Sequence, residues 1–152
     1  MGSFATLRAH SLRSSAMCVI AGASFAAGEL LLELEGDAVS SPSRCSIQIG
    51  RHTHLVPCAN ADCVWRYLNH SCRPNAIVRG RRLVALAPIA VGDEVTFDYN
   101  CTEYEMAAPF RCRCGHCDGV VVGGFHHLNE QQRRERHSCL APYLELAAAA
   151  GA

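Results

Sequence analysis

The chain has 152 residues, of which 49% are hydrophobic and 18% are charged; this predicts one globular domain that buries roughly two-thirds of its unfolded surface. No apolar run approaches the roughly 18 residues of a membrane span, and 14 basic residues balance 14 acidic ones, so we expect neither a membrane nor nucleic acid as a direct partner. Every basic residue is arginine, which excludes a lysine nucleophile or a lysine Schiff base.

Residues 1–15 contain Arg8, Arg13 and several serines but no acidic residue. We interpret them as a flexible N-terminal arm. The same composition is compatible with an organelle transit peptide, and residues 1–6 also satisfy the short pattern for N-myristoylation, which matches by chance in many proteins.

The following segment, up to residue 104, consists of short apolar stretches separated by glycine and proline, which predicts a mostly β fold of small sheets. The expected strands are residues 30–34, 46–49, 76–79, 83–86 and 94–99, and the expected turns are residues 35–37, 79–81 and 91–93. Residues 62–68 predict one or two helical turns. Residues 72–75 predict a loop, because Pro74 has no amide hydrogen.

Cysteines stand in two separated motifs. Residues 69–75 read Asn-His-Ser-Cys-Arg-Pro-Asn, and residues 112–117 read Cys-Arg-Cys-Gly-His-Cys. The three closely spaced thiols of the second motif lack one ligand of a tetrahedral zinc site, which Cys72 of the first can supply. We therefore predict a structural zinc site made by four residues: Cys72, Cys112, Cys114 and Cys117.

Ten cysteines without a secretory signal indicate metal binding and reduced thiols rather than five disulfides. We expect an intracellular protein, nuclear or cytoplasmic. The six cysteines outside the predicted zinc site have no metal-binding spacing, and a free cysteine behaves as a small buried apolar residue.

Near the C-terminus, Asn129 followed by Gln132 predicts a capping box and a helix through Arg136 or beyond. Pro142 is expected to end this helix, and the alanine-rich tail at residues 147–152 is expected to fray.

Together with Gly-Asp-Glu-Val-Thr-Phe-Asp-Tyr-Asn at residues 92–100, the two cysteine motifs resemble the SET-domain protein lysine methyltransferases that carry a post-SET zinc-binding segment. The resemblance covers residues 16–128, and Gly119, Gly124, Phe125 and Leu128 are similar to those of compact stand-alone members. It implies a SET-domain fold of small curved sheets with a pseudoknot over residues 16–104. A post-SET zinc segment would follow over residues 105–128, and a C-terminal helix with its tail over residues 129–152.

The family resemblance implies an S-adenosylmethionine-dependent transfer of a methyl group to a lysine side chain of a histone or another protein. Asn69 and His70 would hold the cofactor, and Tyr99, at the end of a strand, would be the catalytic residue lining the lysine channel. A sulfonium methyl group is already activated, so the enzyme must mainly align a neutral amine and exclude water. A poorly solvated channel also lowers the pKa of the lysine.

This chain departs from the family pattern at the cofactor segment. The family usually has Gly-x-Gly there, and the counterparts in this chain are Ala16, Met17 and Cys18. Two other classes of function therefore stay open: a catalytically degenerate SET fold that acts as a binding module, and a zinc-stabilised structural protein.

The zinc segment and the channel depart from the family as well. Only two residues separate Cys114 and Cys117, where the family has about four, so His116 is a rival zinc ligand, and reduced thiols without metal are a further alternative. Cys45 stands where related sequences often carry an aromatic residue, which predicts a wider channel.

The substrate protein is not specified by the sequence. Asp98, Glu103 and Glu105 lie close to Tyr99 in the chain and would permit an acidic groove for a histone tail. Substrates other than histones are equally compatible with the sequence.

Overall fold

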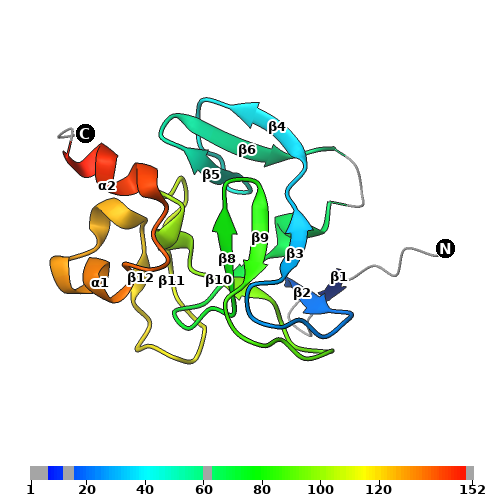
Figure 1. Cartoon of the computed structure of the whole chain (residues 1–152). Coiled ribbons are helices and arrows are strands. Elements are labelled where there is room, and N and C mark those ends of the chain that lie inside the picture. Colours follow the sequence, from blue (N-terminus) through cyan, green and yellow to red (C-terminus); the bar gives the residue numbers. More distant parts are fainter. Residues whose placement is uncertain (1–6, 12–15, 60–62, 150–152) are drawn as a thin grey trace.

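The computed structural model describes residues 7–11, 16–59 and 63–149. It consists of small β-sheets, short 3-10 helices and two helices near the C-terminus, which confirms the predicted mostly β fold (Figure 1). The strands are β1 (Leu7–Ser11), β2 (Met17–Ala21), β3 (Leu30–Glu33), β4 (Gly36–Val39), β5 (Ile47–Gly50), β6 (Thr53–Pro57), β7 (Asn69–His70), β8 (Ala76–Arg79), β9 (Arg82–Ala85), β10 (Thr96–Phe97), β11 (Phe110–Arg111) and β12 (Val121–Val122). The helices are η1 (Val64–Tyr67), η2 (Tyr99–Cys101), η3 (Phe125–His127), α1 (Glu130–Glu135) and α2 (Pro142–Ala149).

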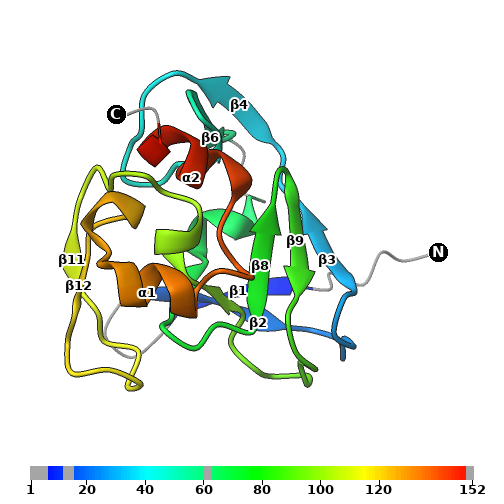
Figure 2. The ribbon, with the colours of Figure 1, turned by 60° about the vertical axis from the view of Figure 1, so that its left-hand side comes forward.

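The strands form five small sheets among the described residues. Two are three-stranded, in the orders β3-β9-β8 and β4-β6-β5, and three are pairs: β1-β2, β10-β7 and β11-β12. In Figure 1 the β4-β6-β5 sheet lies above the β3-β9-β8 sheet, and the β1-β2 pair lies below it. Turning the molecule shows that α1, α2, β11 and β12 are on the side opposite β3 (Figure 2).

The β8-β9 hairpin illustrates how local sequence sets these sheets. Arg79 pairs with Arg82, so Gly80 and Arg81 alone make the turn. Gly80 has a φ of 60°, a left-handed conformation that favours glycine and that a tight hairpin requires. The turn predicted at residues 79–81 is confirmed.

Two apolar clusters hold these elements together. The larger one fills the space between the sheets, and Val19, Leu55, Leu83 and Val95 are completely buried in it. The smaller one joins Cys101 of η2 to Phe125 of η3 and to Leu144 of α2. The C-terminal helix is therefore packed onto the segment that carries Tyr99.

The structure differs from the sequence expectation at the N-terminal arm. Residues 7–11 form β1, which pairs antiparallel with β2 from Leu7 opposite Ala21 to Ser11 opposite Met17. Leu7 is buried, and this packing fixes the strand onto the core. The remaining residues of the expected arm lie outside the described residues, as does residue 62 of the predicted helical turn that η1 confirms.

The C-terminal helix begins as predicted. The Asn129 side chain accepts a hydrogen bond from the Gln132 amide, and the Gln132 side chain accepts one from the Asn129 amide, each at 2.8 Å. This confirms the capping box. The prediction that Pro142 ends the helix is wrong: α1 ends at its C-cap residue Arg136, and Pro142 instead begins α2, where its missing amide hydrogen is no loss.

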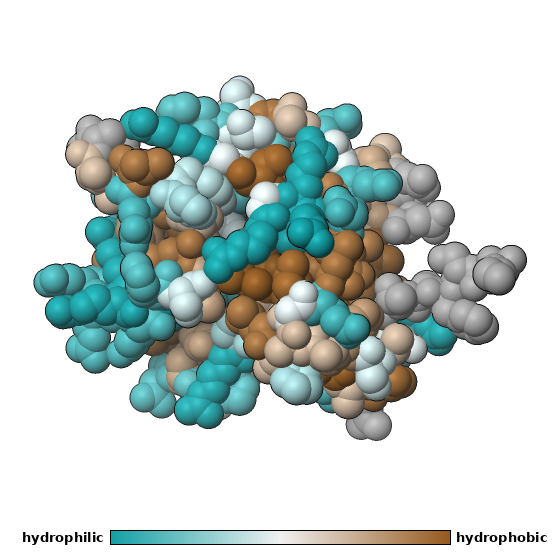
Figure 3. Space-filling view, viewed as in Figure 1, coloured by the Kyte–Doolittle hydropathy of each residue, from teal (hydrophilic) through white to brown (hydrophobic). Residues whose placement is uncertain are grey.

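Helix α2 also corrects part of the expected frayed tail. It extends to Ala149 and buries Ala147, because this face of the helix packs onto the protein; residues 150–152 lie outside the described residues. Helix α1 has no buried residue, and hydrophilic residues cover its side of the molecule in Figure 3. Among the described residues, no helix is both long and apolar enough to span a membrane.

Candidate active site

The two sequence motifs lie side by side. Strands β7 and β10 are parallel, with Asn69 opposite Thr96 and His70 opposite Phe97, and the Ser71 amide continues the ladder to the Phe97 carbonyl at 3.2 Å. Residues 27 positions apart in the chain are thus neighbours. The adjacency of the two motifs that the family resemblance implied is confirmed.

The Asn69 side chain links these motifs to the start of the domain. Its amide group donates to the Met17 carbonyl at 3.0 Å and to a Glu94 carboxylate oxygen at 2.9 Å. The expected cofactor residues Asn69 and Met17 are therefore in direct contact. Ala16 is exposed, whereas Cys18 is 1% exposed, and burial followed by the nearby Glu94 charge raises the pKa of its thiol.

His70 uses both ring nitrogens inside the protein. Its Nδ1 accepts a hydrogen bond from the Tyr99 amide at 3.1 Å, and its Nε2 lies 3.5 Å from Cys72 Sγ. Burial lowers the pKa of the imidazole, which favours the neutral ring that such an accepted bond needs. The ring also packs edge-on against Tyr99 and Phe110.

Tyr99 is displaced from the position that the sequence predicts. The strand covers only residues 96–97, and Tyr99 begins η2. The Asp98 carboxylate accepts a hydrogen bond from the Asn100 amide at 3.0 Å, and this N-cap turns the chain out of the strand before Tyr99. The Tyr99 hydroxyl donates to the Leu68 carbonyl, and burial followed by the charge of Glu103 raises its pKa, so the phenol is neutral at pH 7.

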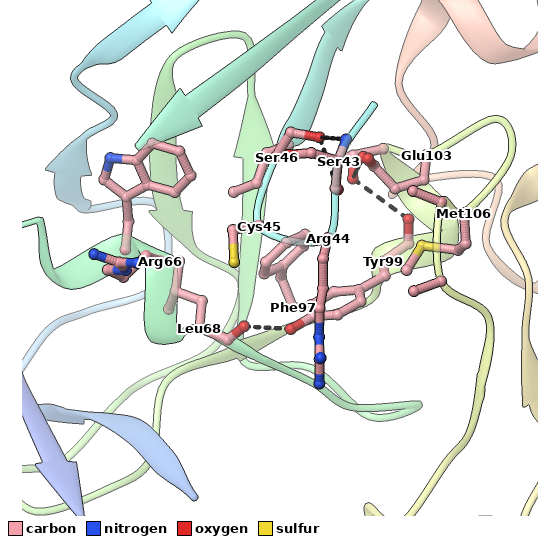
Figure 4. Close-up of a pocket in the computed structure, with 15 residues that line it drawn as sticks. Ser43, Arg44, Cys45, Ser46, Arg66, Leu68, Phe97, Tyr99, Glu103 and Met106 are labelled. Atoms are coloured by element: carbon pink, nitrogen blue, oxygen red, sulfur yellow. Dashed lines mark hydrogen bonds between the residues drawn. The ribbon is translucent and has the colours of Figure 1, made fainter. Parts of the chain in front are cut away.

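A pocket of about 490 Å³, partly open to solvent, is lined in part by Tyr99. Three parts of the chain line it, within residues 43–47, 65–68 and 97–108. Figure 4 shows Tyr99 and Leu68 on one side of this space, with Cys45 and Glu103 at its wall. Cys45 is exposed at the position where the sequence predicted a wider channel.

Sequence reasoning did not predict that the Glu103 carboxyl group is buried. It is 6% exposed, and one carboxylate oxygen accepts hydrogen bonds from the Gln48 amide and from the Thr102 hydroxyl, both at 2.8 Å. Burial raises the pKa of this carboxyl to about 7, although the two bonds oppose the rise. The signal available in the sequence was its position four residues after Tyr99, which places the two side chains on one face of a helical turn.

The burial of Asp98 and Glu103 corrects the expectation that they form an acidic groove with Glu105. Asp98 is 4% exposed, and its carboxylate is 2.6 Å from the Arg136 guanidinium. Both acids are turned inward by these partners, so of the three acids only Glu105 is exposed.

The four predicted zinc ligands come together. The sulfur atoms of Cys72, Cys112, Cys114 and Cys117 all lie within 4.8 Å of one another, with 3.8 Å between Cys72 and Cys112 and 3.9 Å between Cys114 and Cys117. Four sulfurs at about 2.3 Å from a tetrahedral zinc ion are about 3.8 Å apart. The group fits zinc in donor type and spacing.

The cluster also resembles a metal site in its hydrogen bonds. Amide hydrogens of Cys114 and His116 point at the sulfurs of Cys112 and Cys114, each at 3.4 Å. Burial raises the pKa of Cys114, but backbone hydrogen bonds from Cys72 and His116 and side-chain bonds with the Cys112 and Cys72 thiols outweigh burial and lower the pKa to about 6. His116 contributes its amide and is not in the group of four possible ligands. All ten cysteines are free thiols.

Comparison with known proteins bears on these sites. A protein-family model described as the SET domain matches residues 16–100. The chain is 41% identical over 63 residues to "Methyltransferase flvH" of Aspergillus flavus, an overlap of 38% of this chain and 35% of that protein. It is 33% identical over 122 residues to a "Histone-lysine N-methyltransferase, H3 lysine-36 specific" of Yarrowia lipolytica, an overlap of 64% of this chain and 16% of that protein. The chain thus spans well under two-thirds of these curated relatives.

Solved structures share the fold. The crystal structure of KRYPTONITE in complex with mCHG DNA and SAH superposes with a TM-score of 0.56 at 19% identity, covering 74% of this chain and 28% of that one. A second KRYPTONITE structure, which holds mCHH DNA, an H3(1–15) peptide and SAH, superposes with a TM-score of 0.53 at 18% identity and the same coverage.

Proposed function

Because this chain belongs to the SET-domain family, we propose that it is a protein-lysine N-methyltransferase that uses S-adenosylmethionine. One observation carries the proposal: two consecutive residues, Leu68 and Asn69, contact the residues predicted for the lysine and for the methyl donor. The Leu68 carbonyl accepts the Tyr99 hydroxyl beside the pocket, and the next residue, Asn69, bonds to the Met17 carbonyl. A lysine in the pocket and a methyl donor held near Asn69 would then approach each other across this backbone.

The residues of the chain mainly position and dehydrate the amine. S-adenosylmethionine supplies a methyl group that is already activated. Tyr99, neutral and fixed by the Leu68 carbonyl, would orient the lysine nitrogen through its hydroxyl oxygen. Phe97 and Trp65 contribute apolar lining, which removes competing water and favours the neutral amine.

For the methyl donor, we propose that Asn69 and His70 bind mainly through the backbone next to them. Their side chains hold the neighbouring segments in place through the contacts to Met17 and Tyr99. Ala16, Met17 and Cys18 would form the opposite edge of this site. Cys18 is covered by protein, so its side chain does not itself occupy open space.

We also propose that Cys72, Cys112, Cys114 and Cys117 hold one structural zinc ion. Four thiolates leave no open position, so this metal would have no catalytic role. Phe110, next to the cluster in the chain, packs against Tyr99 at a centroid distance of 5.9 Å. The zinc would thus fix the segment that covers Tyr99.

The proposed substrate is a protein lysine, in a histone or another protein, and the proposed place of action is the nucleus. The relatives named as histone-lysine methyltransferases and the H3 peptide in one KRYPTONITE structure support this class. The predicted division into a SET domain over residues 16–104, a post-SET segment over 105–128 and a C-terminal segment over 129–152 belongs to the same proposal.

The test is a radiolabelled-methyl assay with mixed histones and with a cell lysate as substrates. The chain has no lysine, so label recovered in lysine must belong to the added protein. Tyr99→Phe is expected to reduce turnover about 100-fold, as for loss of one transition-state hydrogen-bonding group. Absence of labelled lysine with the wild-type protein, or unchanged turnover and product distribution in Tyr99→Phe, contradicts the proposal.

The second candidate function is a binding module with the same fold and no turnover. The specific observation in its favour is Ala16-Met17-Cys18 in place of the family's Gly-x-Gly. Calorimetric titration with S-adenosylmethionine, run beside the methyl assay, separates the candidates. Binding without transfer to any protein favours the module, and a lack of binding favours a structural protein.

A further inference from the structure

A buried acid stands in the pocket beside Tyr99 without a role in the chemistry described so far. Glu103 follows Tyr99 by four residues, and its amide donates to the Tyr99 carbonyl at 2.9 Å, so the two side chains are presented from one turn of backbone. Both line the pocket, and both carry their polar ends to its wall (Figure 4).

The carboxylate is held in one orientation. One oxygen, Oε2, accepts the Gln48 amide of β5 and the Thr102 hydroxyl. Among the described residues, the other oxygen, Oε1, accepts no hydrogen bond. It is also not fully enclosed by protein. Glu103 therefore offers one unused acceptor from within the pocket.

Two phenols face Glu103. Tyr99 of η2 and Tyr143 of α2 both have a pKa raised by burial first and by the Glu103 charge second. Each hydroxyl is directed to backbone carbonyls, Tyr99 to Leu68 and Tyr143 to Gln48 at 2.6 Å and to Thr102 at 2.9 Å. Neither phenol supplies a charge or a proton to Glu103 at pH 7.

The remaining ionisable neighbours line the same pocket or lie across the sheet. Arg44, Cys45 and Arg66 line the same pocket. His54 of β6 lies opposite Gln48 in the β5-β6 pair, and burial lowers the pKa of its ring, which is therefore neutral at pH 7. Glu103 is the one carboxyl group among the residues that line the pocket.

We propose that Glu103 accepts the proton that the substrate lysine must lose before methyl transfer. The proposal rests on the methyltransferase function proposed above. A lysine enters as an ammonium ion, which has no lone pair and cannot attack a methyl group. In the proposed step one N–H bond of the ammonium breaks, an O–H bond forms on the free oxygen of Glu103, and the bonding electron pair stays on nitrogen as the nucleophilic lone pair.

The environment matches this step. A carboxyl whose pKa burial raises to about 7 is a better proton acceptor than an ordinary glutamate, and the step converts a buried ion pair into two neutral groups. After transfer, the proton leaves to solvent through the open side of the pocket, and the carboxylate is restored.

Glu103→Gln separates this role from a structural one. A glutamine carbonyl oxygen still accepts from the Gln48 amide and the Thr102 hydroxyl, so the scaffold keeps both bonds. The variant loses the negative charge of the carboxylate and with it the ability to take a proton. Glu135→Gln is the matched control, because Glu135 is an exposed carboxyl at the end of α1 and does not line the pocket.

The decisive measurement is the single-turnover methylation rate of a lysine peptide from pH 6 to 10. We expect Glu103→Gln to be about 100-fold slower at pH 7. The deficit should shrink as pH rises, because the peptide then supplies its own free amine. Thr102→Val removes a bond that stabilises the carboxylate, so the pH midpoint of the rate should rise, whereas Glu135→Gln should follow the wild type.

Two outcomes overturn the proposal. The first is a Glu103→Gln rate that runs parallel to the wild-type rate at every pH, which indicates a structural role. The second is a Glu103 carboxyl that titrates near 4.5 in the wild-type protein by carbon-13 NMR, a measurement that needs no turnover and no variant that folds. A wild-type protein that transfers no methyl group instead refutes the methyltransferase function itself.

Discussion

Two regions after residue 104 hold the Tyr99 segment in place, and they do so by different physics. The cysteine region, residues 105–122, has only the two-residue strands β11 and β12, and Phe110 and Val121 are exposed. The helical region, residues 125–149, buries Phe125 and Leu144 against Cys101 and places Arg136 on Asp98. The first region therefore depends on its three cysteine sulfurs and on that of Cys72, whereas the second is held by an apolar core and an ion pair.

Removing the metal is expected to have the largest effect and to change the cysteine region much more than the helical region. Cys72→Ser, or treatment with a chelator, should abolish zinc binding and methyl transfer and expose residues 108–122 to hydrogen exchange, because two-residue strands cannot fold by themselves. Amides around Leu144 should stay protected, since they belong to the apolar cluster.

Metal content by mass spectrometry and hydrogen exchange test this comparison. Cys45→Ser, which lies outside the cluster, is the control for metal content. Protein purified without chelator that contains no zinc, or equal loss of protection in both regions, would show that the two regions are not independent.

Breaking the ion pair should produce the opposite pattern. Arg136→Met leaves the buried Asp98 carboxylate without its cation, and we expect about 3 kcal/mol lower stability with zinc content unchanged. Denaturant unfolding measures the loss. Adding Asp98→Asn should recover part of it, and failure to recover any would mean that Arg136 acts through its other contact, the Gln132 carbonyl.

Glu103 lies under the helical region, beneath Tyr143, and makes stability depend on pH. Its pKa is raised from 4.5 to about 7 in the folded protein, so the folded state binds the proton more tightly than the unfolded state. The free energy of unfolding should therefore fall as pH rises from 4.5 to 7, by up to about 1.4 kcal/mol per pH unit.

Two buried histidines act in the opposite direction. The pKa values of His54 and His70 are lowered by burial, so their contribution to stability rises as pH increases towards 6.5. The difference between wild type and Glu103→Gln isolates the glutamate. A difference that is constant between pH 4.5 and 7 contradicts the raised pKa.

The smallest expected effect is at the start of α1. Gln132→Ala removes one half of the capping box and leaves the Asn129 side chain bonded to the helix amide. We expect about 0.5 kcal/mol lower stability and unchanged zinc content. Thermal unfolding of this variant and of Gln131→Ala, a solvent-exposed neighbour, provides the comparison; equal changes in both would show that the box contributes nothing beyond helix propensity.

Local sequence was enough to predict several secondary-structure elements and to identify the motifs that meet in the fold. The turn at Gly80, the helical turn before Asn69 and the capping box at Asn129 each depend on a few adjacent residues, and all were predicted. Residue type and spacing also identified the four cysteines, because zinc chemistry accepts few donor sets. Proline misled the prediction at Pro142, since a residue without an amide hydrogen can begin a helix as readily as end one.

Tertiary structure alone decided which polar groups are buried and what they face. Glu103 accepts the amide of Gln48 from 55 positions away, and Asp98 meets Arg136 across 38 positions. The spacing from Tyr99 can place Glu103 on the face of that residue, but no neighbour in the chain shows that Asp98 or Glu103 is buried while Glu105 is exposed. Burial, and with it the pKa of a carboxyl, depends on contacts between distant segments, so the sequence determined the family and the sulfurs, while the fold determined the acid beside Tyr99.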